Sequence, residues 1–383
     1  MKLQQIVLDD QKKANVVYSS VDFSSYKVSL VLAFGERSLL EHLQPYDAIH
    51  TLYPNAEIVI CSTSGQISNT SLVENNVVAT AISFEKTEIK VAEIDVLKES
   101  NIQELVKKIQ KDFYEKSLKS VLILSEGSFV NGTELINELI KLTEGKIPIF
   151  GGLAGDEYNF KKTIVGLNQD AVPGKIVAVG FYGNAIHFGF GSDGGWSDFG
   201  PERKVTQSDK NVLFKLGDRF ALDLYKEYLG KYADELPGSS LYFPLSMKES
   251  NESEPVVRTI LSIDEENKSM TFAGNIPEGA LVRLMKGNLD RLVDASYSAA
   301  SQTITEQHDK PELALLVSCV GRKIVLGNRI EEELDVVKEV FGENTLVCGF
   351  YSYGEISPKL EKVACELHNQ TMTIATFMKN CDG

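Results

Sequence analysis

Two features next to each other in the second half of the chain could carry chemistry. Cys319 precedes Arg322 by three residues, where a predicted strand passes into a predicted helix. A nearby guanidinium lowers the pKa of a thiol and favours the thiolate. The same guanidinium could instead bind a carboxylate through two parallel hydrogen bonds. Arg322 is therefore a candidate anion-binding residue, and Cys319 is either a reactive thiol or a small buried packing residue.

A second thiol, Cys61, opens a run of small polar residues at the end of a predicted buried strand. Ser62, Thr63 and Ser64 follow it, and Gly65 then allows a turn. No histidine stands beside this thiol, and the Gly-x-Ser-x-Gly pattern of a hydrolase elbow is absent. Hydroxyls at a strand end could line a polar pocket, so Cys61 and the three hydroxyl residues are candidates for ligand binding. A simple turn is the plainer interpretation.

Two glycine-containing stretches could bring backbone groups to a small molecule. Gly151 and Gly152 begin the first stretch, which ends at Asp156 and lacks the spacing of a phosphate-binding loop. Backbone N–H groups there could meet a carboxylate or a carbonyl of a ligand. The second stretch surrounds the only tryptophan, Trp196, which could cover a pocket or fill an interface.

A tyrosine pair adds a third candidate wall. Tyr351 and Tyr353 alternate along an extended stretch that ends at Glu355. The two rings would face the same side, because alternate residues of a strand share a face. The Glu355 carboxylate could neutralise an amine, so this stretch predicts a wall for a polar small molecule.

A repeated unit positions these residues. Apolar strands at 121–125 and 314–319 are each followed by a helical stretch and then by a glycine-containing strand, at 148–156 and 346–355. Each copy closes with a β-branched run, and the two copies lie about 195 residues apart, which is typical of an internal repeat. Such units predict two related lobes, and small-molecule pockets tend to form between lobes.

Local patterns predict further elements. Ser38 and Glu41 have the spacing of a capping box, which predicts one helix from Ser38 to about His50. Asn131 or Thr133 could cap the helix of the first repeat unit. The apolar runs Val77–Phe84 and Glu88–Val96 are separated by three residues, which predicts a β-hairpin.

The predicted elements give a fold class and a domain boundary. Strands alternate with helices, and several strands follow one another directly. This pattern predicts an α/β (α+β) protein with mixed sheets flanked by helices, and it argues against a purely parallel sheet. Pro237 and Gly238 lie in a segment, 230–240, that is typical of a linker. The predicted domains are therefore 1–232 and 233–383.

Composition limits the function classes. The chain has 383 residues and a net charge of −15, which argues against binding to nucleic acid or to an anionic membrane. Five scattered cysteines without a Cys-x-x-Cys pair predict reduced thiols, and no histidine spacing predicts a metal site. The N-terminus lacks the pattern of a targeting segment, and no apolar run is long enough to span a membrane. We therefore expect a cytoplasmic protein without membrane insertion.

Several motifs of the chain resemble those of the FIST domain family. The matching stretches in the first half are Cys61–Gly65, Pro148–Asp156, Gly195–Trp196 and Val205–Thr206. Those in the second half are Arg258, Pro277–Gly279, Ser318–Arg322, Gly349–Ile356 and Asn369–Thr371. The resemblance spans about residues 27–375 and implies a FIST N-terminal domain followed by a FIST C-terminal domain. Ser64 and Gln66 stand where the family commonly has Ala and Glu. This departure leaves the ligand preference open.

The resemblance also implies a function. FIST proteins are regarded as sensory, small-ligand-binding modules of intracellular signal transduction, and amino acids are the usual suggestion for the ligand. Some relatives are tied to haem, and others to the recognition of ubiquitin-ligase substrates. The family has no settled catalytic residues, so the resemblance carries none over to this chain. The sequence carries no kinase or cyclase segment of its own, so we expect a separate signalling protein of that kind as the partner.

The leading hypothesis is a sensor for a small polar, amino-acid-like ligand. Arg322 would bind its anionic group, Glu355 and the tyrosines would face its cationic end, and the glycine turns would supply backbone donors. The full set of candidate ligand-binding residues is Cys61, Ser62, Thr63, Ser64, Gly151, Gly152, Asp156, Trp196, Arg258, Cys319, Arg322, Tyr351, Tyr353 and Glu355. The alternatives are a haem-binding gas or redox sensor, a cysteine-dependent enzyme and a protein-interaction scaffold.

Overall fold

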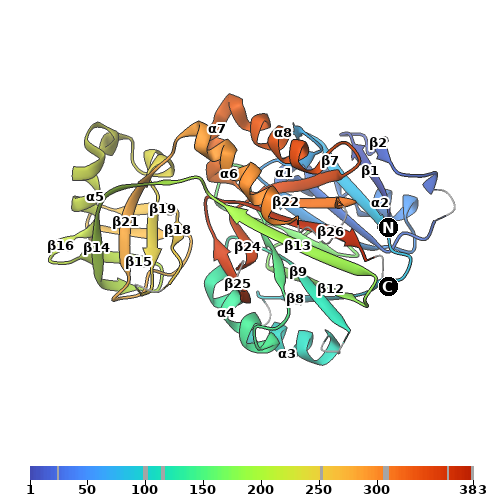
Figure 1. Cartoon of the computed structure of the whole chain (residues 1–383), viewed down its shortest axis with the longest axis horizontal. Coiled ribbons are helices and arrows are strands. Elements are labelled where there is room, and N and C mark those ends of the chain that lie inside the picture. Colours follow the sequence, from blue (N-terminus) through green and yellow to red (C-terminus); the bar gives the residue numbers. More distant parts are fainter. Residues whose placement is uncertain are drawn as a thin grey trace.

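The chain forms two bodies that lie side by side (Figure 1). The computed structural model describes residues 1–23, 26–97, 102–113, 117–250, 253–304, 310–359 and 362–380. The larger body contains three mixed sheets and is called here the three-sheet body. The smaller body, residues 197–286, is called the β-module. The predicted fold class, mixed sheets with flanking helices and an internal repeat, is confirmed.

Three copies of one unit build the three-sheet body. The first unit comprises β3 (Leu30–Glu36), α1 (Arg37–Leu43), α2 (Tyr46–Leu52), β4 (Glu57–Thr63) and β7 (Val77–Ser83). The second comprises β9 (Leu118–Ser125), α4 (Gly132–Thr143), β10 (Ile149–Leu153) and β12 (Lys175–Tyr182). The third comprises β22 (Leu313–Cys319), α7 (Val320–Leu326), α8 (Ile330–Phe341), β23 (Leu346–Ser352) and β26 (Met372–Lys379). In each unit the first two strands are parallel and the last is antiparallel to the first. The second and third units are the predicted repeat, and the first unit is a copy that the sequence analysis missed.

The three sheets exchange strands in a cycle. Short strands that follow β4, β10 and β23 each cross to the sheet of another unit. β5 (Gln66–Ser68) pairs with β23, β11 (Val165–Leu167) pairs with β4, and β24 (Gly354–Lys359) pairs with β10. The strands that precede the units close the other side of each sheet: β1 (Lys2–Leu8), β8 (Glu88–Asp95) and β13 (Ile186–Asp193). One edge of each sheet is formed by β2 (Ala14–Ser19), β6 (Ser71–Val73) or β25 (Lys362–His368), and the opposite edges are β11, β13 and β8. Each sheet therefore depends on residues from two distant parts of the chain.

The inner faces of the three sheets share one apolar core. Phe34 and Phe350 stack there at 4.7 Å between ring centroids, and Phe150 meets Phe377 edge-on at 5.9 Å. Helices cover the outer faces: α1 and α2 on the first sheet, α3 (Ile102–Phe113) and α4 on the second, and α6 (Leu289–Gln302), α7 and α8 on the third. Burial on both faces explains why these strands are continuously apolar in sequence.

The β-module is a single antiparallel sheet with its own core. It contains β14 (Ser197–Asp209), β15 (Val212–Leu216), β16 (Arg219–Phe220), α5 (Ala221–Leu229), η2 (Gly230–Glu235), η3 (Gly238–Tyr242), β17 (Leu245–Lys248), β18 (Val256–Arg258), β19 (Ile260–Asp264), β20 (Ser269–Phe272) and β21 (Leu281–Lys286). β14 pairs with β21, and β15 pairs with β20. The predicted linker 230–240 lies inside this module as two short helical turns. The predicted boundary between residues 232 and 233 therefore falls within one folded sheet, between strands that hydrogen-bond to one another.

Two local predictions were wrong. The expected single helix from Ser38 is broken into α1 and α2, because Gln44 adopts the left-handed conformation and Pro45 follows it. Ser38 lies inside α1 and caps nothing. The expected hairpin does not form, because β7 lies between β1 and β3 in one sheet whereas β8 pairs with β12 in another.

A third local prediction was right. The Asn131 side chain caps α4 by accepting hydrogen bonds from the backbone N–H groups of Thr133 and Glu134.

Among the described helices, none is both long and apolar enough to cross a membrane.

Candidate functional site

Three of the predicted motifs meet at one end of the three-sheet body. Backbone hydrogen bonds join the carboxyl ends of β4, β10 and β23 in a closed ring. Gly155 N donates to Ser62 O at 2.9 Å, Ser64 N donates to Tyr351 O at 2.8 Å, and Tyr353 N donates to Leu153 O at 3.2 Å. The strands β5, β11 and β24, which each pair with the sheet of another unit, start next to the carboxyl ends of β4, β10 and β23. Their exchange therefore brings these three strand ends together. Strand ends of this kind are where α/β proteins commonly bind ligands.

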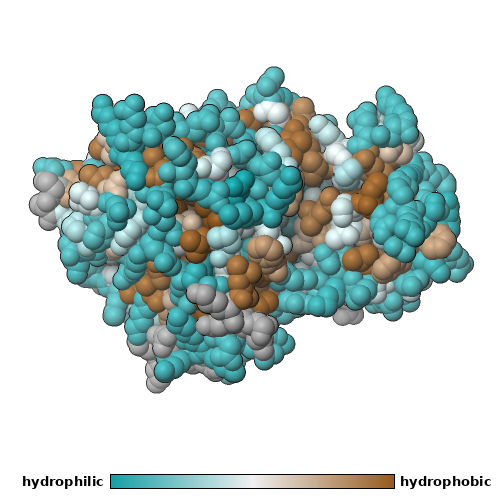
Figure 2. Space-filling model, turned by 180° about the vertical axis from the view of Figure 1, so that it is seen from behind, coloured by the Kyte–Doolittle hydropathy of each residue, from teal (hydrophilic) through white to brown (hydrophobic). Residues whose placement is uncertain are grey.

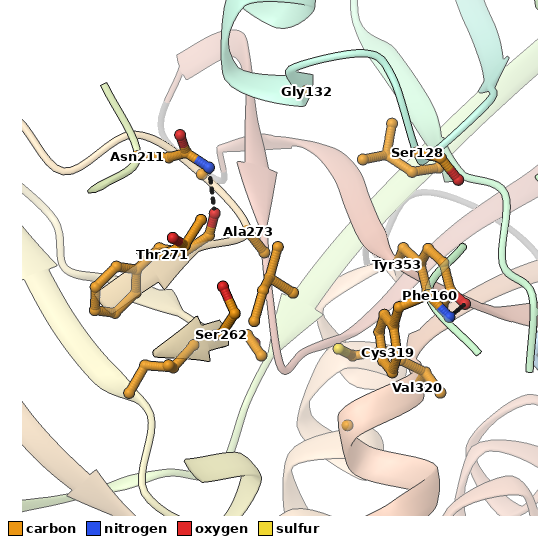
Figure 3. Close-up of a pocket in the computed structure, with 18 of the residues that line it drawn as sticks. Ser128, Gly132, Phe160, Asn211, Ser262, Thr271, Ala273, Cys319, Val320 and Tyr353 are labelled. Carbon is orange, nitrogen blue, oxygen red and sulfur yellow. Dashed lines mark hydrogen bonds between the residues drawn. The ribbon is translucent and has the colours of Figure 1, made fainter. Parts of the chain in front are cut away.

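A cavity of about 640 Å³ lies next to this ring, at the junction of the two bodies (Figure 3). We call it the junction cavity, and its size is within the ~300–1,000 Å³ of small-molecule sites. The three-sheet body contributes residues 127–132, which follow β9, together with Leu153, Phe160, Tyr353 and residues 319–321 at the end of β22. The β-module contributes Asn211, Pro237, Gly238, Leu241, residues 259–262 and residues 271–274. A molecule in this cavity would touch both bodies.

One buried carboxylate shapes the loop that forms the upper wall in Figure 3. Glu126 accepts hydrogen bonds from the backbone N–H groups of Ser128, Phe129 and Val130 at 3.0, 2.7 and 2.6 Å. These bonds wrap the chain around the carboxylate before Asn131 starts α4. Glu126 therefore fixes the backbone of residues 128–130, which line the cavity.

Among the residues that the structure describes, none that lines the junction cavity has a side chain charged at neutral pH. The polar side chains of the lining are Ser128, Asn131, Asn211, Thr259, Ser262, Thr271, Cys319 and Tyr353, and most of the rest are glycine or apolar. Thr259 is only 6% exposed, and its Oγ1 has no hydrogen-bond partner among the described residues. A buried hydroxyl without a partner is costly. The Oγ1 atom is itself buried, so the Thr259 side chain must turn before this hydroxyl can reach a ligand in the cavity.

Exposed apolar side chains surround the cavity. Phe129, Phe160 and Leu261 are 60%, 45% and 44% exposed. Phe160 stacks on Tyr353 at 4.6 Å, and the Tyr353 hydroxyl accepts a hydrogen bond from Phe160 N at 3.0 Å. Figure 2 shows apolar surface in patches along the junction of the two bodies. Exposed apolar surface gathered at a concave site is typical of a binding surface.

Cys319 lines the junction cavity, and its sulfur is directed toward the gap in Figure 3. Burial raises the pKa of this thiol, and the nearby Glu355 carboxylate raises it further. Burial also raises the pKa of Cys61, which lies in the shared core. Both groups are thiols at neutral pH, which weakens the cysteine-enzyme alternative. The described cysteines form no disulfide, and Cys381 lies outside the described residues.

Arg322 does not face the junction cavity. Its side chain is fully buried, and Nε and Nη2 donate to the Glu333 carboxylate at 3.1 and 2.8 Å. The remaining donors bind Gly194 O, Leu292 O and Ser296 Oγ. Tyr351 donates to the other oxygen of Glu333 at 2.7 Å. The expectation that Arg322 binds a ligand carboxylate is not supported, because a carboxylate of the same chain already occupies the guanidinium.

Glu355 is also turned inward. It is fully buried and accepts hydrogen bonds from Ser352 Oγ, Thr371 N and Thr371 Oγ1 at 2.9, 3.1 and 2.9 Å. Burial raises its pKa to about 8, although these bonds and Arg322 act in the opposite direction. The predicted role of neutralising a ligand amine does not fit a carboxyl group that is sealed from the cavity.

The raised pKa of Glu355 predicts a pH-dependent stability. The folded chain keeps the proton where the unfolded chain has lost it, so stability falls as the pH rises from about 4.5 to about 8. A Glu355→Gln variant lacks this titration, so its free energy of unfolding should fall less steeply with pH than that of wild type. The two slopes should differ by about 1.4 kcal/mol per pH unit. Urea denaturation of both proteins at the ends and the middle of this range measures the difference. Parallel slopes would contradict a neutral Glu355.

The other predicted residues serve the structure of the ring and its surroundings. Ser62 Oγ donates to Gly155 O, Thr63 Oγ1 donates to Gln66 Oε1, and Ser64 Oγ donates to Glu157 O. All three hydroxyls are buried. They fix the turns between strands and do not line the junction cavity.

Asp156, Trp196 and the glycine pair likewise lie outside the junction cavity. Asp156 accepts from Arg37 Nε at 2.7 Å. Trp196 donates from its indole nitrogen to Gln370 O at 2.8 Å and packs where the chain enters the β-module. Gly151 and Gly152 lie in β10 and pack against neighbouring strands.

Arg258, the remaining predicted residue, lines a second and smaller cavity. Cys319 and Tyr353 are thus the members of the predicted set that line the junction cavity. The loop 127–132 and the β-module wall could not be recognised from the sequence, because neither contains a chemical motif. Among the described residues no cluster of three or more His, Cys, Asp or Glu side chains is placed to hold a metal ion.

Comparison with known families gives the chain's relationship. The FIST N domain matches residues 29–219, and the FIST C domain matches residues 221–358. The comparison with curated proteins found no match. The two domain matches meet at the start of α5, inside the β-module, and together they cover most of the chain. The chain therefore belongs to the FIST family of signal-transduction sensor domains.

Proposed function

We propose that this protein senses a small uncharged, partly apolar molecule that binds in the junction cavity. The observation that carries the proposal is the lining, which comes from both bodies and, among the described residues, includes no charged side chain. The sensory role of FIST domains agrees with a ligand site of this kind.

An uncharged ligand fits the junction cavity better than the amino-acid-like ligand expected from sequence. That expectation placed a carboxylate on Arg322 and an amine at Glu355, and both side chains face away from the cavity. A charged group that leaves water without a counter-charge loses several kcal/mol. Ser262 and Thr271 would donate or accept hydrogen bonds, while Leu153, Phe272 and Val320 would contact apolar parts of the ligand.

The two bodies supply a way to transmit binding. The chain crosses between them twice, before β14 and after β21. Polar contacts join them elsewhere, including Asn131 Nδ2 to Asn275 Oδ1 at 2.9 Å and Asn275 N to Thr133 Oγ1 at 3.3 Å. Small polar interfaces permit relative motion. A ligand that contacts both bodies would favour one arrangement over another, and a separate partner such as a kinase or a cyclase would respond.

A substitution that fills the junction cavity tests the proposal. Ala273 lines the β-module wall, so Ala273→Trp should occupy the space of the ligand. We expect a neutral compound found by a thermal-shift screen of wild type to raise the Tm saturably and to lose this effect in Ala273→Trp. Asp218→Trp, at an exposed turn of the same module, should keep it.

Two outcomes decide between hypotheses. Unchanged binding of the neutral compound in Ala273→Trp would place it outside the junction cavity and contradict the proposal. The same screen includes haem, and a Soret band with a Tm rise that survives Ala273→Trp would favour the haem-sensor alternative. Cytoplasmic location stays a prediction from the sequence.

A further inference from the structure

Two aromatic rings stack face to face beside the junction cavity. Phe160 and Tyr353 both line this cavity, their ring centroids lie 4.6 Å apart, and their planes differ by 14°. Phe160 N also donates a hydrogen bond to Tyr353 Oη at 3.0 Å. Figure 3 shows the two side chains next to each other, with this hydrogen bond dashed. The cavity therefore contains an aromatic face that a residue of the same chain already covers.

Tyr353 is the fixed member of this pair. It follows β23, and its backbone N–H donates to Leu153 O in the ring of strand ends. Its side chain packs against the apolar core between the second sheet and the helices that cover it. Gly127 approaches the ring so closely that an added Cβ atom would lie 3.4 Å from Tyr353 Cδ2. These contacts hold the Tyr353 ring in place whether or not Phe160 lies on it.

Phe160 lies at the tip of a short loop that is anchored at both ends. Residues 158–161 are exposed, whereas Asp156 before them is buried. Asp156 accepts hydrogen bonds from Arg37 Nε at 2.7 Å and from Lys162 N at 3.3 Å, so one carboxylate binds both ends of the loop. The tip belongs to no strand. Phe160 can therefore leave Tyr353 without breaking any strand pairing.

The backbone of Phe160 opposes the stacked position. Its φ is +51°, in the left-handed region that residues with bulky side chains rarely adopt. Strained residues of this kind gather at ligand sites and switch segments. The ring stack and one hydrogen bond compensate for the strain while Phe160 lies on Tyr353. A ligand that replaces the stack would also release the strain, so Phe160 is readily displaced.

The walls of the junction cavity restrict which ligand could take this place. A flat aromatic ring gains stacking energy on Tyr353 beyond the burial of its area, and a saturated ring of the same size does not. Among the described residues the lining has no charged side chain, which favours an uncharged molecule. Ser262 and Thr271 on the β-module wall offer hydroxyls to an amide or hydroxyl group of the ligand.

We propose that Tyr353 is the stacking platform for a small, flat, uncharged aromatic ligand, and that Phe160 occupies this platform until the ligand displaces it. This inference rests on the function proposed above and adds the class of ligand and an internal competitor. Since the competitor must leave first, it lowers the apparent affinity for the ligand. Removing the Phe160 ring should therefore tighten binding, which is the reverse of the effect expected for a residue that holds the ligand.

Two amides of similar size test the inference. Benzamide has a flat ring, cyclohexanecarboxamide has a saturated one, and both are uncharged. Titration calorimetry of the full chain should give the higher affinity for benzamide. Phe160→Asn removes the ring but tolerates the left-handed backbone. It should tighten benzamide about two- to tenfold, the contribution of one stacked aromatic pair. Phe220→Asn is the matched control, because Phe220 is also 45% exposed but lies in β16 outside the cavity, and it should leave the affinity unchanged.

Two variants of the platform complete the test. Tyr353→Leu removes the aromatic face, so it should weaken benzamide about two- to tenfold and abolish the preference over cyclohexanecarboxamide. Tyr353→Phe keeps the face but loses the oxygen that accepts from Phe160 N, so it should bind benzamide at least as tightly as wild type. If Tyr353→Leu fails to fold, Phe160→Asn at an exposed site and Tyr353→Phe still decide the question.

Several results would overturn the inference. Weaker benzamide binding in Phe160→Asn would make Phe160 part of the binding wall and not a competitor. Equal affinities of wild type for the two amides would remove the aromatic platform, as would no benzamide binding to wild type or Phe160→Asn at millimolar concentration. Both results leave the proposed function intact as long as another neutral compound binds wild type and loses its effect in Ala273→Trp. If no neutral compound does so, the proposed function and this inference fail together.

Discussion

Replacing Arg322 with methionine should lower the free energy of unfolding by about 3–5 kcal/mol, because it strands a buried carboxylate. Glu333 is fully buried and accepts bonds from Arg322, Tyr351, Ser318 and Ser296. The three hydroxyls cannot neutralise its charge. The variant chain must either bury that charge or protonate it, and both alternatives cost stability. Chemical denaturation of wild type and variant measures the loss.

Two further proteins make this measurement specific. Arg329, seven residues further on, pairs with Glu332 and Asp290 at the surface, so Arg329→Met should cost less than about 1 kcal/mol. The double variant Arg322→Met, Glu333→Gln removes both charges and should recover much of the loss. Equal stabilities for the two single arginine variants would refute the structural role assigned to Arg322.

This network also explains why the sequence misled us about Arg322. An arginine three residues after a strand-end cysteine has the type and spacing of an anion-binding residue. Its partner, Glu333, lies one helix further along and gives no signal in the sequence. Pairing between α7 and α8 could be recognised only once the packing of both helices on the third sheet was known.

The repeat could be predicted because its signals are local. An apolar strand, a helical stretch and a glycine-containing strand follow one another in the second and third units, and both units fold as expected. The first unit escaped notice because Ile60 stands in β4 where the other two units have Gly151 and Gly349. The prediction of a hairpin from Val77–Phe84 and Glu88–Val96 failed because the partners of β7 are not local in sequence. β7 is buried along its whole length as an inner strand, and its partners come from earlier in the chain.

The candidate site is the part that sequence could least specify. The ring of strand ends did collect the Cys61, Gly151 and Tyr351 motifs, which shows that the motifs mark a shared location. Their side chains, however, hold the ring together. The cavity beside it is closed on one side by the β-module, whose contact residues include ordinary threonines, serines and apolar side chains. Only the folded arrangement of the two bodies brings them opposite Cys319 and Tyr353.

Two glycines of the repeat allow the parallel strands of their units to pack closely. Gly151 and Gly349 have φ values of +131° and +157°, and both occupy the matching place in β10 and β23. A Cβ atom on Gly151 would lie 2.0 Å from Ile123 O, and one on Gly349 would lie 2.0 Å from Leu316 O. These contacts are with backbone of the adjacent parallel strand, which cannot move aside without breaking the sheet.

Gly151→Ala should therefore destabilise the protein by about 4 kcal/mol or more, and Gly349→Ala should have a comparable effect. Gly217 provides the matched control, because it has φ +58° in a turn of the β-module, and a methyl group added there would meet no described atom within 4 Å. Gly217→Ala should cost only about 1 kcal/mol, from backbone conformation alone. Thermal and urea denaturation of the three variants separates the cost of steric overlap from the cost of a left-handed backbone. If all three variants lose the same free energy of unfolding, the close approach of the paired strands is not the reason why Gly151 and Gly349 must be glycine.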